Sequence, residues 1–398
     1  MSNVSWRIGQ REVEYIKEAI DSGLTGKMNQ RLEEAFAKKF GVKYAIGVNS
    51  GNSALHCCLA AMGIGAGDEV IVPPLTFGSP AFAAMYQGAI PVFADVDPET
   101  FTIDPNDIKK KITPRTRAII TVALYGLPPD MDPIMEIAKS HNLFVIEDCA
   151  ECYLGKYKGR LAGTIGDMAI FSFERSKHMT TGNGGIIITN SEELAEKARK
   201  FSVMGYSTLR AETSESKPPK EVIQDPNFDR HLLVSPNYRL PEICAAMALS
   251  QLERLDEFVR KRIEIAKLYG EAVQNCNWLK PQKTPEGFIN SYWTYAIKLE
   301  DDDREVSWHL FRKTYLDEGG DPFYAAWKLT YMEPALSQVR FKGQNIIYKK
   351  GICPVAEYLQ PKLIQLKTNY GTIEHAKEQA DALKKTIQKL STRKRQNP

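Results

Sequence analysis

The sequence lacks a long hydrophobic run and an excess of charge of either sign. No stretch of about 18 apolar residues occurs, so no membrane span is predicted. Lys and Arg total 52 against 49 Asp and Glu, and this net charge of +3 is too small to indicate nucleic-acid binding. Charged residues follow the N-terminal Met before the apolar core of a signal peptide could form, so we expect a cytoplasmic protein.

The seven cysteines are an odd number without the spacing of a disulfide framework, which is typical of reduced thiols. Cys149 and Cys152 form a C-x-x-C motif that could bind zinc or act in redox chemistry. A second pair at metal-binding spacing is missing, because Cys57 and Cys58 are adjacent. We therefore expect no metal site, and interpret the C-x-x-C pair as small packing residues after a strand.

What the chain does have, between residues 43 and 190, is an alternation of short apolar runs and amphipathic segments. The apolar runs are continuous in Val, Ile, Ala and Phe, as in strands covered on both faces by helices. This alternation predicts an α/β fold with a mostly parallel sheet and right-handed crossovers. The expected strands are 43–49, 69–72, 90–96, 118–124, 143–147, 168–173 and 185–189, and the expected helices are 53–62, 79–87 and 132–140.

The remainder predicts a loop, a long helix and a smaller domain. Residues 204–236 are polar and without a sustained period, which favours a long surface loop. Residues 241–276 carry Leu, Phe and Ile at helical spacing, which predicts one long helix. We expect a large domain at 1–255, including an N-terminal helical segment, and a small α+β domain at 256–398. The latter would hold a strand at 291–298 and helices at 306–316 and 373–390.

A first candidate motif lies at residues 48–55 (VNSGNSAL), which end an expected strand and open an expected helix. Gly51, Asn52 and Ser53 would present free backbone N–H groups at the positive end of that helix, a favourable place for a phosphate. The same residues are also compatible with a plain helix cap, so the motif alone does not decide between the two.

A second motif places two carboxylates, Glu147 and Asp148, at the C-terminal end of an apolar strand. Ligands bind beyond this end of the strands in open α/β sheets. A carboxylate there can keep a heteroaromatic nitrogen protonated by charge pairing. The alternative is an acidic cap for the following turn, and only one of the two is needed for function.

A third motif follows the expected strand that ends at residues 171–173 (FSF): a short loop with Lys177, then a glycine-rich turn at 182–185. A lysine between an apolar strand and a glycine turn is partly desolvated, and such a lysine can act as nucleophile and base. The alternative is an ordinary surface charge. His178 could be a second acid or base, although a lone histidine is more often structural.

Phosphate cradle, acid, lysine and the aromatic segment 74–77 (PLTF) together predict a pyridoxal 5'-phosphate site. Enzymes that use this cofactor combine a lysine Schiff base with an aspartate facing the pyridinium nitrogen. Asp148 precedes Lys177 by 177 − 148 = 29 residues, enough for an excursion between neighbouring strands.

With these motifs in place, the chain resembles the sugar aminotransferases of the DegT/StrS type, in the fold-type I PLP superfamily, nearly from end to end. The segments that carry the resemblance are 63–73 (GIGAGDEVIVP), 89–97 (AIPVFADVD), 147–148 (ED), FSF…K…TGNGG within 171–185, and 237–240 (NYRL). The resemblance implies a large domain with a mostly parallel, seven-stranded type of sheet between helices, followed by a smaller α+β domain.

Residue by residue, the resemblance implies that Lys177 forms the Schiff base with pyridoxal phosphate. Asp148 would pair with the pyridinium nitrogen, and Phe77 would stack on the ring. Lys177, once released from the cofactor, would shuttle the proton between substrate and cofactor as base and acid.

Ser172 and the backbone of Gly51, Asn52 and Ser53 would hold the cofactor's phosphate. Asn237 would reach the phosphate of the neighbouring subunit's cofactor. The resemblance therefore implies a homodimer with shared active sites, and a two-fold dimer is also the commonest symmetry.

Some positions depart from the family's usual pattern. Asn52 stands where Thr is usual, Glu151 where a Gln usually lies near the cofactor's hydroxyl, and Asn183 where Glu is usual. Residues 319–331 also differ from the pattern of that region. Within this last segment, Tyr324 and Trp327 could supply a surface for a sugar or nucleotide, or serve as core aromatics.

The implied reaction is transfer of an amino group from glutamate or glutamine to a nucleotide-linked keto-sugar, for amino-sugar and surface polysaccharide biosynthesis such as lipopolysaccharide O-antigen. The nearest alternative is a sugar dehydratase of the same family, which places His at the Schiff-base position. Two others are a non-catalytic regulatory protein, expected to have lost Lys177 or Asp148, and a desulfurase, which needs a reactive Cys on a mobile loop.

Overall fold

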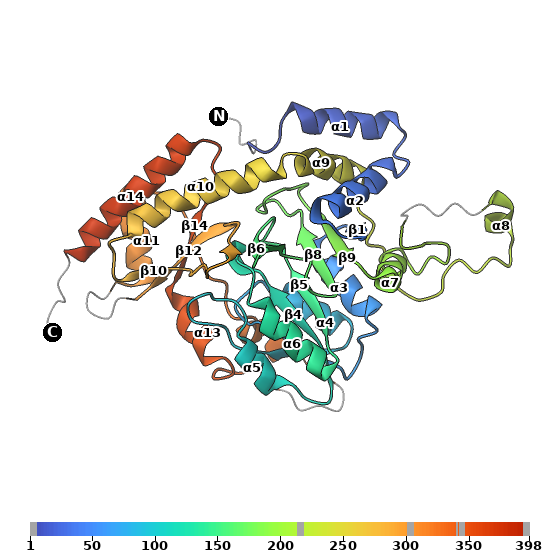
Figure 1. The fold of residues 1–398 in the computed structure, drawn as a ribbon, viewed down its shortest axis with the longest axis horizontal. Helices are drawn as coiled ribbons and strands as arrows, with labels where there is room; N and C mark the ends of the chain where they lie inside the picture. The colour runs from blue at the N-terminus through green and yellow to red at the C-terminus, as the bar shows by residue number, and fades with distance from the viewer. Residues whose placement is uncertain (1–5, 213–218, 301–305, 340, 342–346, 393–398) are drawn as a thin grey trace.

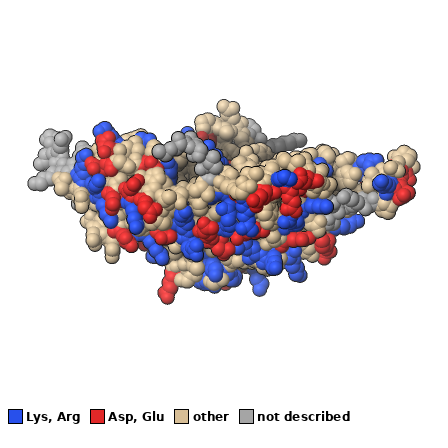
Figure 2. Space-filling model, turned by 90° about the horizontal axis from the view of Figure 1, so that it is seen from above, with Lys and Arg blue, Asp and Glu red and all other residues tan. Residues whose placement is uncertain are grey.

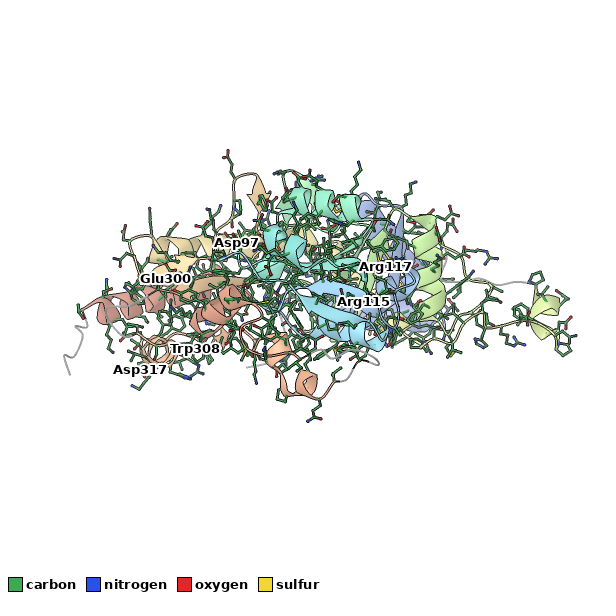
Figure 3. All side chains as sticks on the ribbon, turned by 90° about the horizontal axis from the view of Figure 1, so that it is seen from below. Asp97, Arg115, Arg117, Glu300, Trp308 and Asp317 are labelled. Carbon is green, nitrogen blue, oxygen red and sulfur yellow. The ribbon has the colours of Figure 1, made fainter. Side chains whose placement is uncertain are left out.

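Figure 1 shows a computed structural model of the chain, which describes residues 6–212, 219–300, 306–339, 341 and 347–392. A central sheet with helices on both faces forms one part, and a smaller sheet covered by long helices lies beside it. In Figure 3, the labelled Glu300, Trp308 and Asp317 gather at the end that holds the smaller sheet, whereas Arg115 and Arg117 mark the central sheet.

The central sheet has seven strands in the order β1-β9-β8-β5-β4-β2-β3. Their bounds are β1 Tyr44–Val48, β2 Glu69–Val72, β3 Ile90–Phe93, β4 Thr116–Val122, β5 Phe144–Asp148, β8 Met168–Ser172 and β9 Gly185–Thr189. β9 runs antiparallel to both β1 and β8, and the other neighbours pair in parallel. The predicted strands are all present, and the predicted mostly parallel sheet is confirmed.

Helices cover both faces of this sheet. One face carries α3 (Gly51–Ala61), α4 (Ser79–Tyr86) and α7 (Glu192–Ser202). The other carries α2 (Lys27–Phe40), α5 (Pro105–Lys111), α6 (Met131–His141) and α9 (Glu242–Leu252). α1 (Gln10–Asp21) packs on α9 at the outside.

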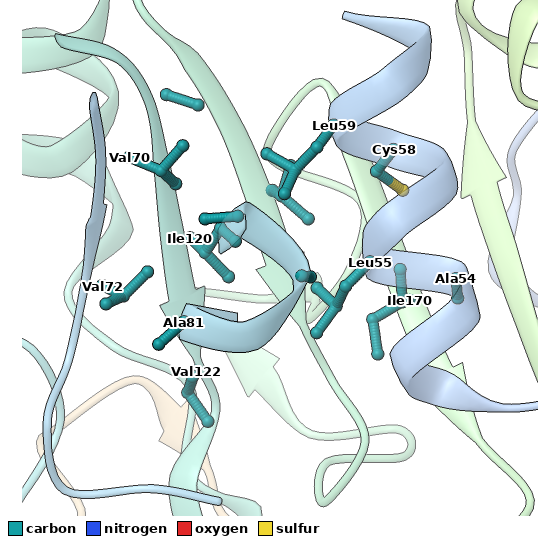
Figure 4. Packing of buried hydrophobic residues seen from close by; sticks show 14 of the residues in the cluster. Ala54, Leu55, Cys58, Leu59, Val70, Val72, Ala81, Ile120, Val122 and Ile170 are labelled. Carbon is teal, nitrogen blue, oxygen red and sulfur yellow. The ribbon is translucent and has the colours of Figure 1, made fainter. Parts of the chain in front are cut away.

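Alternate side chains of each strand point to opposite faces, and here both faces are buried. Val70 packs in the cluster under α3, while its neighbour Ile71 packs in the cluster under α5 and α6. Figure 4 shows Leu55 and Leu59 of α3 directed toward the strands that carry Val70 and Ile120. Burial on both faces is therefore the reason that these strands read as continuous apolar runs.

The smaller sheet is antiparallel, in the order β10-β12-β14-β13. Its strands are β10 Leu279–Pro281, β12 Thr294–Leu299, β13 Tyr324–Ala325 and β14 Leu363–Lys367, and the helices around it are α10 Leu255–Val273, α11 Trp308–Asp317 and α14 Ile373–Ser391. A separate core cluster joins these helices to the sheet.

Short elements complete the chain: β6 Lys156–Tyr157, β7 Arg160–Leu161, β11 Phe288–Ile289, α8 Lys220–Gln224, α12 Pro334–Ser337, α13 Pro354–Leu359, and the 3-10 turns η1 Leu124–Gly126, η2 Thr330–Met332 and η3 Gln360–Lys362.

The domain boundary at residue 255/256 stays a prediction. It coincides with the first residue of α10, but Leu329, Tyr331 and Leu359 from the C-terminal part pack in the core cluster of the central sheet. The C-terminal segment thus crosses back over the large domain before it returns to β14.

The single helix expected at 241–276 is wrong, because the chain forms α9 and α10 with a break at Glu253 and Arg254. Both helices bury apolar residues in neighbouring core clusters, so the helical spacing of apolar residues continues across the break. The sequence pattern therefore does not show where the first helix ends. At the break, Arg254 Nη2 donates to the backbone oxygen of Arg7 at 2.9 Å and also pairs with Glu12.

The region expected as a long loop, 204–236, contains α8, and its residues 213–218 lie outside those described. Figure 1 shows α8 at the far end of a projection from the body of the molecule. Basic and acidic side chains are interspersed over the face seen in Figure 2. Within the described ranges, no helix combines the length and the apolarity needed to cross a membrane.

Candidate active site

A cavity of about 410 Å³ opens at the carboxyl ends of the central strands. Val122, Asp148 and Ser172 are the last residues of β4, β5 and β8, and each of them lines it. The N-terminus of α3 forms another side. Parallel strands end at one edge of a sheet and ligands bind at that edge, so the topology brings separate sequence motifs together.

Eight residues predicted from the sequence line this cavity: Gly51, Asn52, Phe77, Asp148, Glu151, Ser172, Lys177 and Trp327. Ser53 does not line the cavity; its N–H donates to Oγ of Ser50, the N-cap of α3, at 3.0 Å. The three other predicted residues, His178, Tyr324 and Asn237, are not among the lining residues.

Lys177 reaches the cavity floor and forms an ion pair with Glu151. The distance from Nζ to Glu151 Oε1 is 3.1 Å, and the side chains are 13% and 5% exposed. The other carboxylate oxygen of Glu151 accepts the backbone N–H of Tyr125 at 3.0 Å. Lys177 is therefore not an ordinary surface charge: a carboxylate that is itself fixed by the backbone holds its amine inside the site.

Asp148 is buried beside this pair, with Oδ1 accepting the N–H of Ala150 at 3.0 Å. Burial raises the pKa of Asp148 to about 6, opposed by the Ala150 N–H and Lys177 and assisted by Glu151. Burial disfavours the ionised form of this carboxyl group, and a cation placed against it would stabilise that ionised form. A protonated ring nitrogen would supply that charge.

The neighbouring carboxylate, Glu147, has a structural task. It accepts the backbone N–H groups of Gly163 at 2.8 Å, and of Ile165 and Gly166 at 2.7 Å. Adjacent strand residues point to opposite faces, so only Asp148 of the pair reaches the cavity.

The N-terminus of α3 lines the cavity and forms a cradle with the polarity for a phosphate. Gly51 approaches the end of β8 closely, since a Cβ on it would lie 3.1 Å from Ser172 Cβ. A Cβ on Gly185 would lie 2.8 Å from the Gly51 nitrogen, so glycine is required there as well. Asn52 Oδ1 is buried and has no hydrogen-bond partner among the described residues. The free N–H groups at the start of α3 can donate to a phosphate, whereas the unpaired Asn52 Oδ1 is an acceptor and fits a ligand group that donates a hydrogen bond.

An aromatic corner faces the cradle. Trp293 and Trp327 stack with ring centroids 5.8 Å apart, and Phe77 meets Trp327 edge-on at 5.8 Å. Lys177 Nζ lies 4.4 Å from the Trp293 ring. Phe77 is 59% exposed, so its ring has room for a flat partner.

Sequence reasoning did not assign several lining residues to the site. They are Ser50, Thr76, Ser79, Glu174, Ser176, Asn183, Gly184 and Trp293. Most are direct neighbours of predicted residues, and Asn183 was noted as a departure from the family pattern. Trp293 comes from the distant 291–298 segment, and a local motif gave no sign that it would reach Lys177.

His178 and Tyr324 lie away from the cavity. His178 is fully buried, its Nε2 lies 3.0 Å from the backbone oxygen of Ser291, and burial, together with Arg262, lowers its pKa well below the ordinary value. A neutral, enclosed imidazole is placed to pack rather than to meet a substrate. Tyr324 is 70% exposed on β13 and does not line the cavity.

Asn237 is exposed and does not line the cavity of its own chain. It pairs with Val203 in an isolated antiparallel β-bridge. Its Oδ1 accepts from the backbone N–H of Arg239 at 3.4 Å and from Arg239 Nη1 at 3.2 Å. Its expected role at a neighbouring subunit's cofactor stays a prediction.

Sequence comparison gives one family over nearly the whole chain. The model of the DegT/DnrJ/EryC1/StrS aminotransferase family matches residues 7–381. A GDP-perosamine synthase of Escherichia coli is 39% identical over 308 residues, which are 76% of this chain and 79% of that protein. One of Caulobacter vibrioides is 41% identical over 299 residues, 74% of this chain and 76% of that protein.

Solved structures agree with this result. An aminotransferase from Psychrobacter cryohalolentis is 29% identical with a TM-score of 0.86, over 97% of this chain and 98% of that one. DesV of S. venezuelae, in complex with a ketimine intermediate, is 28% identical with a TM-score of 0.82, over 94% of each chain. A GDP-4-keto-6-deoxymannose-3-dehydratase shares the fold, with a TM-score of 0.83 at 23% identity.

The residues of the cavity fit pyridoxal 5'-phosphate. The cradle at Gly51 and Asn52 suits its phosphate, the exposed ring of Phe77 suits its flat ring, and Asp148 and Lys177 suit its nitrogen and its aldehyde. The chain therefore belongs to the DegT/DnrJ/EryC1/StrS aminotransferase family, with pyridoxal 5'-phosphate as its cofactor.

Proposed function

We propose that this enzyme transfers an amino group from glutamate or glutamine to a nucleotide-linked keto-sugar. The observation that carries the proposal is the placement of Lys177 Nζ in the cavity, 3.1 Å from Glu151 and at the strand edge that also presents Asp148. The names of the two GDP-perosamine synthases support a nucleotide-linked acceptor. A spore coat polysaccharide biosynthesis protein of Bacillus subtilis, 39% identical, supports a product that enters a surface polysaccharide.

The chain's own residues divide the work of amino transfer. Pyridoxal phosphate, when bound, supplies an aldehyde that accepts the amino group and a ring that stores negative charge. Lys177 would hold the aldehyde carbon and, when a donor amine displaces it, carry a proton between the substrate carbon and the cofactor carbon. Asp148 would keep a proton on the ring nitrogen by charge pairing. Glu151 would orient the lysine amine through their ion pair.

The cradle would bind the cofactor's phosphate, and the aromatic corner would orient the substrate. The N-terminus of α3 and Ser172 would hold the phosphate, which fixes the ring against Asp148. Trp293 and Trp327 offer flat apolar surface on the opposite side, suited to the apolar face of a sugar or to a base. Trp293 also lies against the Lys177 amine, with Nζ 4.4 Å from its ring centroid.

The dehydratase alternative has less support. The loop presents Lys177 to the cavity, while His178 is enclosed elsewhere, so a register shift of one residue does not put histidine at the reactive position. The dehydratase structure is 23% identical, a level that supports the fold alone. Five of the seven cysteines are buried and none of the seven lines the cavity, which disfavours the desulfurase reading.

The first experiment is the visible spectrum of protein purified with pyridoxal phosphate, before and after glutamate or glutamine. Wild type should show a cofactor band that one donor bleaches, and Lys177→Ala should lack this change. A cofactor band that neither donor alters would overturn the amino-transfer proposal. Sugar nucleotides carrying a keto group should then restore the band in the bleached protein, which identifies the acceptor.

We further propose a homodimer with shared sites, in a cytoplasmic location. Asn237 supports the shared sites, because this exposed residue of the segment 237–240 does not line the cavity of its own subunit. Mixing Lys177→Ala with Asn237→Ala subunits should restore about one intact site in each mixed dimer. Mixed samples as inactive as the two variants, with mixed dimers shown by mass spectrometry, would contradict shared sites.

A further inference from the structure

The loop that carries Lys177, residues 174–178, is held from behind by two buried arginines that do not line the cavity. We call this segment the lysine loop. Arg262 comes from α10, and Arg7 comes from the segment before α1. Their side chains are among the largest that are fully enclosed in the described part of the chain, at 1% and 2% exposed.

Arg262 links the lysine loop to the segment that carries Trp293. Its Nη1 donates to the backbone oxygen of Trp293 at 2.8 Å and to Thr368 Oγ1 at 3.0 Å. Its Nη2 donates to the backbone oxygens of Ser176 at 3.4 Å and Lys177 at 3.3 Å. Trp293 Nε1 in turn donates to the oxygen of Ser176 at 3.0 Å. One guanidinium thus fixes the lysine backbone relative to the aromatic corner.

Arg7 holds the same loop from its other flank. Nη2 donates to the backbone oxygen of Arg175 at 2.8 Å, and Nη1 donates to the oxygens of Lys177 and His178, the latter at 3.3 Å. The two arginines therefore converge on the carbonyl of Lys177. Consecutive backbone carbonyls in an irregular loop lack the hydrogen bonds that a helix or sheet would give them. The N–H groups of one guanidinium can donate to several of these carbonyls at once.

The segment around Arg7 is itself anchored to α10, to its N-cap residue Arg254 and to the segment that follows β14. Trp6 Nε1 donates to Asn369 Oδ1 at 3.0 Å, and its ring meets Phe258 edge-on at 5.2 Å. Arg254 donates to the backbone oxygen of Arg7 at 2.9 Å. These contacts make residues 6–9 a strap that delivers one guanidinium to the back of the active site.

The arrangement is costly, which argues that it serves more than packing. Burial lowers the pKa of Arg7 to about 10, and burial together with the nearby Arg7 charge lowers that of Arg262 well below its usual range. Two like charges are thus enclosed near each other, and Arg262 Nε has no hydrogen-bond partner among the described residues, so the burial is expensive. Their shared target is the backbone of the one residue whose side chain must move during the reaction.

We propose that Arg7 and Arg262 are positioning residues that fix the backbone of Lys177 while its side chain moves between the cofactor and the substrate. The proposal rests on the proposed amino transfer for its kinetic effect, but the rigidity of the lysine loop is a property of the cofactor-free protein. Displacement of a reacting group by about 1 Å can cost on the order of 10²-fold in rate.

The test compares Arg262→Met, Arg262→Lys and Arg7→Met with the wild type. Arg260→Met, an exposed arginine two residues earlier on α10, is the matched control. Amide hydrogen exchange of the cofactor-free proteins is measured by mass spectrometry on a peptide spanning 174–182, with a peptide from β2 as internal reference. We expect at least 10-fold faster exchange in the lysine loop of Arg262→Met and Arg7→Met, and no change at β2 or in Arg260→Met.

Kinetics supply the second readout. The donor half-reaction should lose on the order of 10²-fold in kcat in Arg262→Met, with little change in KM. Arg262→Lys should recover only part of kcat, because a single ammonium lacks the fork that reaches both the loop and Trp293. If Arg262→Met does not fold, Arg7→Met and deletion of residues 1–8 carry the same expectations.

Wild-type exchange at 174–182 in folded Arg7→Met or Arg262→Met, or wild-type kcat in both, would overturn the proposal. If the wild type is inactive but the variants still exchange faster than the wild type in the lysine loop, the proposed function is contradicted and the positioning role of the two arginines stands. The two failures are therefore distinguishable.

Discussion

Lys177 Nζ and Glu151 Oε1 lie 3.1 Å apart in the cavity, on segments that follow two neighbouring strands. The other oxygen of Glu151 is fixed by the N–H of Tyr125. The ion pair is nearly enclosed. This chain therefore places a full negative charge against the reactive amine and beside Asp148.

Glu151→Gln and Glu151→Ala should differ. Glutamine keeps an acceptor for Tyr125 and a polar contact to Lys177, so we expect a change of about 10-fold or less in kcat of the donor half-reaction. Alanine leaves an enclosed ammonium without its carboxylate, and should also cost about 3 kcal/mol of unfolding free energy. Stopped-flow spectroscopy and urea unfolding would measure the two effects; equal behaviour of both variants would contradict a role for the pair.

Asp148 should make the cofactor-free protein less stable as pH rises. Its pKa is raised from 3.8 to about 6 in the folded chain, so the folded state binds the proton more tightly than the unfolded state. The resulting stabilisation is complete below about pH 4 and is lost as pH rises through about 6. The shift corresponds to at most about 3 kcal/mol. Urea unfolding between pH 4 and 8 should show this slope in wild type and a smaller one in Asp148→Asn.

The same Asp148→Asn variant should lose activity on the order of 10²-fold or more, because an amide cannot hold the ring nitrogen protonated. Lys177 remains, so the protein should still bind pyridoxal phosphate. Equilibrium dialysis of the cofactor, beside the rate of the donor half-reaction, separates these effects. An active Asp148→Asn enzyme would remove Asp148 from the catalytic residues.

Gly185→Ala should disturb the phosphate cradle. An added Cβ would meet the backbone of Ser50 at 2.7 Å and Gly51 at 2.8 Å, so α3 or β9 must shift. We expect a loss of about 1–3 kcal/mol in stability and weaker cofactor binding. Gly270→Ala, within α10, is the control: its added Cβ would lie 3.6 Å from Tyr295 Oη, so it should be neutral or stabilising. Unchanged cofactor affinity in Gly185→Ala would place the phosphate elsewhere.

Trp327→Ala should impair the acceptor more than the donor. Trp327 lines the cavity, meets Phe77 edge-on and stacks on Trp293, where we expect a large substrate to lie. Removal of an aromatic surface of this kind costs about 1–3 kcal/mol, or roughly 10- to 10²-fold in KM of the sugar nucleotide. Tyr324→Ala, outside the cavity on the same segment, is the matched comparison. Equal effects of both variants would deny Trp327 a specific role.

Much of the site was predictable because its chemistry lies in short segments at the ends of strands. Gly51 to Ser53, Asp148 and Lys177 each follow an apolar run, and parallel strands deliver their carboxyl ends to one edge. The motif alone did not choose between Glu147 and Asp148, although the family resemblance implied Asp148. The sequence offers two carboxylates in a row, and only the pleat of β5, with the backbone N–H groups of residues 163–166, gives Glu147 another partner.

The sequence by itself determined the α/β alternation, the order of the central strands along the chain and the residue types that amino transfer needs, because these depend on local periodicity and on short motifs. The tertiary structure alone decided that His178 is enclosed while Lys177 is presented, that α9 and α10 are separate, and that Trp293, Arg7 and Arg262 meet at the lysine loop. Contacts between residues 85 to 170 positions apart leave no local pattern, since they depend on how whole elements pack.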